Sequence, residues 1–247
     1  MTNTRKTSVL VTGGNKGLGL ETARRLGERG WTVFLGSRDH GRGRAAADKL
    51  AADGADVVMV PLDVTSDPSV AEAVRLVRAH TDRLDVLVNN AGAPGHVVTP
   101  AEATVEEIHA VYDTNVYGAI RVTHAFLPLL QAAEHPRVVM VGSAGGSFAT
   151  VTDPTQPVSK MHELAYSSSK AALHMITVRY AQALPAIKFN VATPGEVANH
   201  KFAATDMNRH TGELTVTEGT DPIVRLATLD ADGPTGIFID RLGPVAW

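Results

Sequence analysis

The sequence contains no cysteine among its 247 residues. Disulfide bonds, thiolate metal ligands and a cysteine nucleophile are therefore excluded, and we expect a protein of the reducing cytoplasm. No apolar run is long enough to cross a bilayer, so we expect no membrane association. The first residues are polar, include Arg5 and Lys6, and lack the apolar stretch of a secretory signal, so we expect none.

The charge balance excludes further classes of partner. The formal net charge is −3, and 44% of the residues are hydrophobic and 20% charged, as in ordinary globular proteins. A chain without a basic excess gives no reason to expect a nucleic-acid partner. Ten histidines are present, but none forms a His-Glu-x-x-His motif or an i, i+4 pair beside an acid, so we expect no metal site.

Strand and helix patterns alternate along the chain. Short apolar runs predict strands at 9–11, 32–36, 57–60, 84–88, 138–141, 188–191 and 236–239. Amphipathic stretches predict helices at 18–29, 41–53, 67–80, 105–130, 163–184 and 218–229, with Pro128 kinking the fourth. We therefore expect one α/β domain over residues 1–247, of the Rossmann type: a doubly wound parallel sheet of about seven strands with helices on both faces. Residues 196–217 fit neither pattern.

The glycines after the first strand predict a phosphate site. Gly13, Gly17 and Gly19 lie between a buried strand and a helix, inside a βαβ unit. Glycines let the backbone approach a pyrophosphate, and the N–H groups and dipole of the new helix attract its charge. The alternative is a plain turn. Ligands of such sheets bind at the carboxyl ends of the strands, which collect Gly13, Ser37, Asp63, Asn90, Ser143 and Pro194 along one edge.

Tyr166 and Lys170 are four residues apart at the start of a predicted helix, so both side chains lie on one face. Reduction of a carbonyl leaves negative charge on oxygen, and a tyrosine hydroxyl can supply the proton. A nearby lysine ammonium would stabilise the phenolate and could hold ribose hydroxyls. Ser143 could donate a hydrogen bond to the carbonyl oxygen. The alternatives are a half-buried core tyrosine and a turn serine.

With these residues, the chain resembles the short-chain dehydrogenase/reductase family. The matching elements are Thr12-Gly13-x-x-x-Gly17-x-Gly19, Asp63-Val64, Asn89-Asn90-Ala91-Gly92, Asn115, Ser143, Tyr166-x-x-x-Lys170 and Pro194-Gly195. The resemblance implies catalytic roles for Asn115, Ser143, Tyr166 and Lys170, with the asparagine holding a water in a proton relay to the lysine. It implies that the cofactor contacts Gly13, Asn15, Lys16, Gly17, Leu18, Gly19, Ser37, Arg38, Asp63, Val64, Asn90, Ala91, Gly92, Tyr166, Lys170, Pro194 and Gly195.

The end of the second strand favours NADP(H) over NAD(H). An NAD site usually presents an acid there to hold the ribose 2′-hydroxyl. Eighteen residues after Gly19, where family members often carry that acid, this chain has Ser37, followed by Arg38. Ser37 could bond a 2′-phosphate, Arg38 could pair with it, and Lys16 adds a second cation. The alternatives are a solvated Lys16 and Arg38, or Asp39 as a displaced ribose ligand.

Two departures from the family pattern concern the substrate. Ser143 and Tyr166 are 23 residues apart, a longer gap than usual, which resembles the carbonyl-reductase branch. After Pro194-Gly195, residues 196–217 resemble an insertion in a substrate lid. Either Asn199 or Thr205 could take the nicotinamide carboxamide. His200 and Lys201 are expected to be exposed loop residues, with substrate contact as the alternative.

The expected function is NADPH-dependent reduction of a small or medium ketone or aldehyde. One alternative is a 3-oxoacyl-carrier-protein reductase, for which Lys160, Lys201 and Arg209 would face the acidic carrier. Another is a catalytically silent NADP-sensing regulator. Helices 105–130 and 163–184 could form a homodimer or homotetramer contact, as the resemblance implies.

Overall fold

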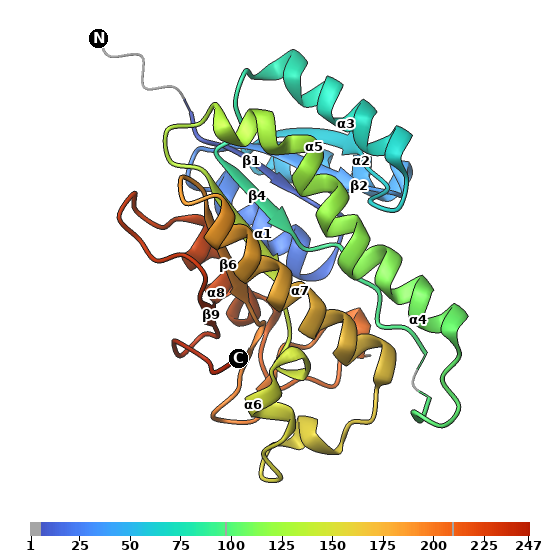
Figure 1. The fold of residues 1–247 in the computed structure, drawn as a ribbon. Coiled ribbons are helices and arrows are strands. Elements are labelled where there is room, and N and C mark those ends of the chain that lie inside the picture. The colour runs from blue at the N-terminus through green and yellow to red at the C-terminus, as the bar shows by residue number, and fades with distance from the viewer. Residues whose placement is uncertain (1–5, 97, 209) are drawn as a thin grey trace.

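A computed structural model describes residues 6–96, 98–208 and 210–247. It contains a seven-stranded sheet in the order β3-β2-β1-β4-β5-β6-β9, with every pairing parallel, which confirms the predicted fold class (Figure 1). The strand order reverses between β1 and β4. The strands are β1 (Ser8–Val11), β2 (Thr32–Ser37), β3 (Asp56–Pro61), β4 (Val86–Asn89), β5 (Arg137–Val141), β6 (Lys188–Ala192) and β9 (Phe238–Ile239).

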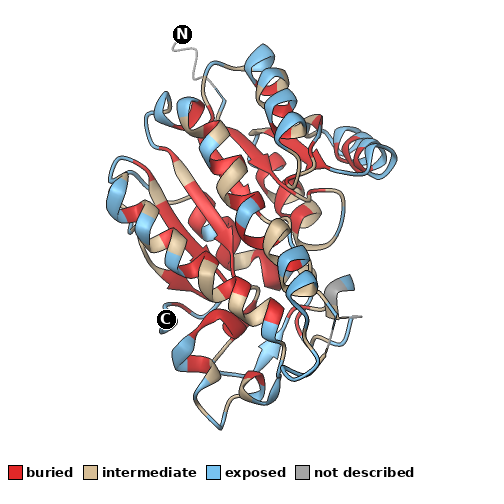
Figure 2. Ribbon diagram, turned by 45° about the vertical axis from the view of Figure 1, so that its right-hand side comes forward, coloured by how far each residue is buried: buried red, intermediate tan, exposed pale blue. Residues whose placement is uncertain are grey.

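The sheet is buried on both faces because successive side chains point to opposite sides. In β1, Leu10 packs with Phe34 under one layer of helices, and Val9 and Val11 pack under the other. The first layer is α3 (Asp67–His80), α5 (Ala119–Gln131) and α7 (Leu164–Ala183); the second is α1 (Gly17–Gly27), α2 (His40–Ala52) and α8 (Val216–Ala227). Figure 2 shows the buried residues gathered along the strands and the inward helix faces.

Polar side chains set where several helices begin. Asp39 accepts a hydrogen bond from the Arg42 N–H at the start of α2, at 2.9 Å. Thr104 and Glu107 form a reciprocal capping box at the start of α4 (Val105–Tyr112), and Thr215 and Glu218 do the same for α8. Such caps stabilise a helix by about 1 kcal/mol each. The cap at Thr215 explains why α8 begins two residues before the predicted helix.

The predicted helix 105–130 is not regular. A π-helical turn, Asp113–Gly118, separates α4 from α5. It contains Asn115, and a Cβ on Gly118 would lie 2.8 Å from Val64, so this wide turn packs closely on the loop after β3. Single π turns inside helices are frequent at functional sites. Helix α5 runs through Pro128 to Gln131, one residue beyond the predicted end.

Two irregular segments lie beyond the carboxyl edge of the sheet. The first precedes α7 and contains short helical turns at Ala144–Gly146 and Pro157–Lys160 and helix α6 (Phe148–Val151). The second holds a small antiparallel pair, β7 (Gly195–Glu196) and β8 (Lys201–Phe202), and an isolated bridge between Ala203 and Leu214. Antiparallel pairing inside an otherwise parallel protein explains why no simple periodicity marks residues 196–217.

The expectations about a membrane, a metal ion and a second copy of the chain can be compared with the structure. In the described part of the chain, no helix is long and apolar enough to cross a membrane. Over the same residues, no group of three or more metal-binding side chains comes together. The helices α4 and α7 contact each other, and Met175 on α7 is 62% exposed. A homo-oligomer contact through these helices stays a prediction.

Candidate functional site

Two polar side chains hold the turn after β1 against the end of β4. The Thr12 hydroxyl oxygen accepts hydrogen bonds from the backbone N–H groups of Asn90 and Ala91, at 3.0 and 2.9 Å. The Asn90 amide donates in return to the carbonyls of Thr12 and Gly13, at 2.9 and 3.2 Å. These two segments therefore form one rigid unit where the strand order reverses, which is where ligands bind in doubly wound sheets.

Glycines shape this turn. Gly13 and Gly17 have φ angles of 63° and 52°, in the left-handed region that favours glycine. A Cβ on Gly19 would lie 2.4 Å from the carbonyl oxygen of Gly13, so only hydrogen fits there. Lys16, the N-cap residue of α1, makes no side-chain capping hydrogen bond. The first N–H groups of α1 therefore suit an anion such as a phosphate.

A cavity of about 890 Å³ lies along the carboxyl ends of the strands. Its volume is within the range of cofactor and ligand sites, about 300–1,000 Å³. Most of the sequence-predicted site residues line it: Gly13, Asn15, Lys16, Gly17, Leu18, Gly19, Arg38, Asp63, Val64, Asn90, Ala91, Gly92, Ser143, Tyr166, Lys170 and Pro194. Ser37, Asn115 and Gly195 are not among the lining residues.

Ser37 lies beneath the cavity wall. It is fully buried, and its hydroxyl donates to the carbonyl oxygen of Asp39 at 2.8 Å. A Cβ on Gly43 of α2 would lie 2.7 Å from the Ser37 Cβ, so the helix packs directly over it. This placement does not support the expected contact with a 2′-phosphate, because the close approach of α2 encloses the side chain.

The cations near the end of β2 are Arg38, Lys16 and a third residue, Arg42, all lining the cavity. Arg42 lies in the first turn of α2, four residues after Arg38, and its Nε is 3.4 Å from the Asp39 carboxylate. Asp39 caps α2, so it is engaged by its own helix. Lys16 pairs with Asp206 at 2.7 Å. Both partners are about half exposed, so this pair is weak and can yield to a stronger anion.

Tyr166 and Lys170 face the cavity from the first turns of α7. The Nζ of Lys170 lies 5.6 Å from the centre of the Tyr166 ring and donates to the carbonyl of Val141 at 2.8 Å. Burial lowers the pKa of Lys170 to about 8. Burial raises the pKa of Tyr166 to about 12, opposed by a hydrogen bond with Ser143 and reinforced by the charge of Glu163. Stabilisation of a Tyr166 phenolate by the Lys170 ammonium stays a prediction.

Ser143 follows β5 and is positioned by α7. Its hydroxyl oxygen accepts from the N–H of Gly145 at 3.2 Å, and its own N–H donates to Nε2 of His174 at 3.4 Å. His174 lies one helical turn beyond Lys170 and packs against Phe238 and Trp247, with ring centroids 4.6 and 5.7 Å away. Burial, and then the charge of Lys170, lower the pKa of His174 to about 3, so the imidazole is neutral and can accept.

Asn115 joins the π turn to two neighbouring segments. Its side-chain oxygen accepts from the N–H of Ala93 at 2.7 Å, and its amide donates to the carbonyl of Ala93 and the hydroxyl of Ser169, both at 3.0 Å. The Ser169 hydroxyl donates in turn to the carbonyl of Tyr166 at 2.7 Å. Asn115 is thus fully bonded within the protein and connects the loop after β4 to the α7 turn that carries Tyr166 and Lys170.

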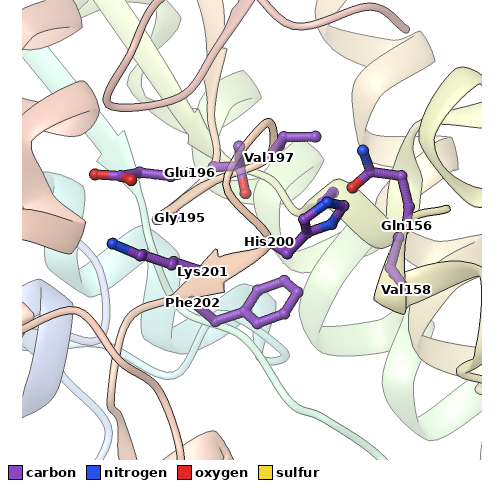
Figure 3. Close-up of a pocket in the computed structure, with 10 residues that line it drawn as sticks. Gln156, Val158, Gly195, Glu196, Val197, His200, Lys201 and Phe202 are labelled. Atoms are coloured by element: carbon purple, nitrogen blue, oxygen red, sulfur yellow. The ribbon is translucent and has the colours of Figure 1, made fainter.

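Part of the cavity lining comes from residues 196–217. Phe202, Thr205 and Asp206 line the cavity, and Asn199 instead donates to Glu196 at 2.8 Å. Figure 3 shows His200 and Phe202 facing Gln156 and Val158 across a smaller adjacent pocket, with Glu196, Lys201 and Gly195 alongside. His200 and Lys201 are exposed and do not line the main cavity, although Lys201 belongs to β8 rather than to a loop. Lys160 is exposed too, and Arg209 lies outside the described residues.

Sequence reasoning missed three side chains at this site: Arg42, Glu163 and His174. His174 lies four residues after Lys170 on the predicted helix 163–184, so a helical-face analysis would have found it. Arg42 lies four residues after Arg38, but Arg38 precedes α2, so the helical spacing does not relate them. Glu163 precedes Tyr166 by three residues and lines the cavity at the start of α7. No local pattern distinguishes it from a solvated acid.

The parallel sheet, the glycine turn and the cavity at the strand ends define a Rossmann-type nucleotide-binding fold. Comparison with known proteins identifies the family. Residues 7–210 match the family model described as short chain dehydrogenase. The chain is 30% identical to (+)-neomenthol dehydrogenase of Capsicum annuum, with 94% of this chain and 95% of the relative covered. It therefore belongs to the short-chain dehydrogenase/reductase family of oxidoreductases, which bind a nicotinamide cofactor.

Solved structures agree. The NADPH-bound carbonyl reductase from chicken fatty liver superposes with a TM-score of 0.85 at 28% identity, covering 98% of this chain and 100% of that chain. Salutaridine reductase from Papaver somniferum superposes with a TM-score of 0.80 at 28% identity, covering 95% of this chain and 99% of that chain. The family thus includes reductases that act on carbonyl compounds.

Proposed function

We propose that this protein reduces a small or medium ketone or aldehyde with NADP(H), using Tyr166 as the proton donor. The observation that carries the proposal is that Tyr166, Lys170 and Ser143 line the same cavity as the glycine turn. A phosphate site and a proton donor thus share one enclosure, as a hydride transfer to a carbonyl requires.

The residues present fit a dinucleotide phosphate. The glycine turn and the uncapped start of α1 suit the pyrophosphate, and Arg38, Arg42 and Lys16 suit a 2′-phosphate. Asp63 and Val64 would border the base, Asn90, Ala91, Gly92, Pro194 and Gly195 the nicotinamide side, and Lys170 the ribose. When bound, NADPH supplies the hydride. Support for NADP(H) comes from the NADPH-bound chicken reductase and from the 28% identical Pseudomonas aeruginosa RhlG, solved with NADP.

The chain's own residues supply the rest of the reaction. The Ser143 hydroxyl donates a hydrogen bond to the substrate carbonyl oxygen and orients it. The neutral Tyr166 hydroxyl gives its proton to that oxygen as negative charge develops. The Lys170 ammonium provides the nearby positive charge. Asn115, through Ala93 and Ser169, keeps the loop after β4 in register with α7.

The remaining segments set the substrate end. We propose that residues 196–217 act as a lid, because Phe202 and Thr205 line the cavity from that segment. The lid and the segment before α7 meet at His200, Phe202, Gln156 and Val158 (Figure 3). Together they exclude water from the carbonyl, which strengthens the electrostatic interactions around it.

A panel of ketones, aldehydes and quinones tests the proposal through substrate-dependent oxidation of NADPH. We expect turnover of at least one carbonyl by the wild type and a loss of roughly 10²–10⁴-fold in kcat for Tyr166→Phe, with NADPH binding retained. The matched control is Tyr180→Phe, because Tyr180 stacks on Phe189 with ring centroids 5.0 Å apart and does not line the cavity. NADPH binding without oxidation by any carbonyl would instead favour a regulator.

A further inference from the structure

The carboxylates that line the cavity differ in whether their oxygens have a hydrogen-bond or ion-pair partner. Asp39 caps α2, Asp63 accepts two hydrogen bonds from Thr65, and Asp206 pairs with Lys16. Glu163 differs from all three: within the described residues no side chain or backbone group donates to its carboxylate, and it does not cap α7 although it is the N-cap residue. A half-buried carboxylate that has no hydrogen-bond donor from the protein is suited to bind a donor or a cation that the ligand carries.

The surroundings of Glu163 place it at the substrate end. The cations Arg38 and Arg42 follow β2, on the far side of the switch point from α7. Met161 and Val158 before α7, Pro94 after β4 and Phe202 of β8 add apolar side chains to the lining of the same cavity. Lys170, one turn beyond Tyr166, is already bonded to Val141. Glu163 thus brings an unpaired carboxylate to a cavity whose lining also includes apolar side chains.

The Glu163 carboxylate is also close to the expected proton donor. It lies three residues before Tyr166 on the same helix turn, and its charge contributes to the raised pKa of that phenol. Partial burial raises the pKa of Glu163 itself, which shows that its charge is poorly solvated. A cation placed beside Glu163 would relieve both effects, since it would pair with the carboxylate and offset its field at the phenol.

We propose that Glu163 recognises a protonated amine on the substrate, so that the favoured substrates are amino ketones or amino aldehydes with an apolar carbon frame. This inference rests on the proposed reductase function and specifies its substrate class. The ammonium pairs with Glu163, the apolar frame packs against Met161, Val158 and Phe202, and the carbonyl reaches Ser143 and Tyr166. A neutral substrate leaves the carboxylate unpaired, and an anionic substrate is repelled by it.

Two ketones of the same shape test this assignment. One is 4′-(dimethylaminomethyl)acetophenone, protonated at neutral pH, and the other is 4′-isobutylacetophenone, in which carbon replaces the nitrogen. For the wild type we expect kcat/KM to favour the amine by roughly tenfold or more, as for a hydrogen bond to a charged group. In Glu163→Gln that ratio should fall toward one. Glu106→Gln, an exposed residue of α4 that does not line the cavity, is the control and should keep the wild-type ratio.

A wild-type ratio of one, or a ratio that Glu163→Gln leaves unchanged, overturns the assignment. If Glu163→Gln unfolds, Glu163→Asp keeps the charge and should keep the preference, and its loss counts equally against the assignment. If the wild type reduces no carbonyl at all, the proposed function fails. In that case, calorimetry measures how tightly each ketone binds to the protein with NADP⁺, which tests the Glu163 assignment without turnover. Tighter binding of the amine supports the assignment, and equal binding refutes it.

Discussion

The ammonium of Lys170 donates a 2.8 Å hydrogen bond to the carbonyl oxygen of Val141, the last residue of β5. This bond fixes the lysine at the strand edge, 5.6 Å from the centre of the Tyr166 ring. The side chain is buried without a carboxylate partner among the described residues, and burial lowers its pKa to about 8. The charge of this lysine therefore depends on pH within the range in which an enzyme can be assayed.

Because of this pH dependence, we expect activity to fall at alkaline pH. Below about pH 8 Lys170 carries its proton, and above it the charge is lost, whereas Tyr166 with a pKa of about 12 stays protonated. We expect kcat/KM for NADPH, which reports the free enzyme, to fall as pH rises through about 8. Lys170→Arg keeps its charge at all accessible pH and should move that fall to higher pH. A wild-type profile that stays flat to pH 10 would contradict this.

Acid should destabilise the fold through His174. Its folded pKa of about 3 lies below the ordinary value of 6.5, so the folded state keeps the imidazole neutral while the unfolded chain takes up a proton. Stability is therefore fully present above about pH 6.5 and is lost as pH falls toward 3, by on the order of 3 kcal/mol between pH 7 and pH 4. Urea unfolding of His174→Gln should show a much shallower acid loss. His124→Gln, at an exposed position of α5, is the control and should behave as the wild type.

The choice of cofactor should depend on two arginines. Arg38→Ala or Arg42→Ala removes a cation that lines the cavity near the end of β2, and we expect each to raise the Kd of NADPH by roughly tenfold and to leave that of NADH nearly unchanged. Arg44→Ala, also exposed on α2 but away from the cavity, is the matched control. Fluorescence titration measures both constants. Equal or better use of NADH by the wild type would refute the assignment to NADP(H).

The glycine turn should not tolerate a methyl group at Gly19. The added Cβ would lie 2.4 Å from the Gly13 carbonyl oxygen and 2.5 Å from the Asn90 amide nitrogen, and the bonds between Asn90 and this turn prevent a simple shift. We expect Gly19→Ala to cost about 1–3 kcal/mol of stability and most of the NADPH affinity. Gly41→Ala, whose nearest atom would be 3.6 Å away in the first turn of α2, should leave both intact. Urea unfolding and NADPH titration distinguish the two variants.

Local patterns were sufficient for much of this protein. Apolar runs located the strands of the sheet because a buried parallel strand is apolar on both faces, as Leu10 and Val11 are. The glycine turn and the spacing of Tyr166 and Lys170 could be predicted because each involves neighbours in the chain, where covalent geometry dictates which side chains meet.

Only the tertiary structure decided which predicted residues face the cavity and which residues join them. Ser37 is enclosed because α2 packs over it at Gly43, and Asn115 is bonded to Ala93 and Ser169, segments remote in sequence. The π turn, the antiparallel pairing of β7 with β8, and the placement of Arg42 and Glu163 on the cavity wall depend likewise on contacts between elements. Periodicity reports how one element buries a face, but the distance between side chains from different elements is set by how those elements pack.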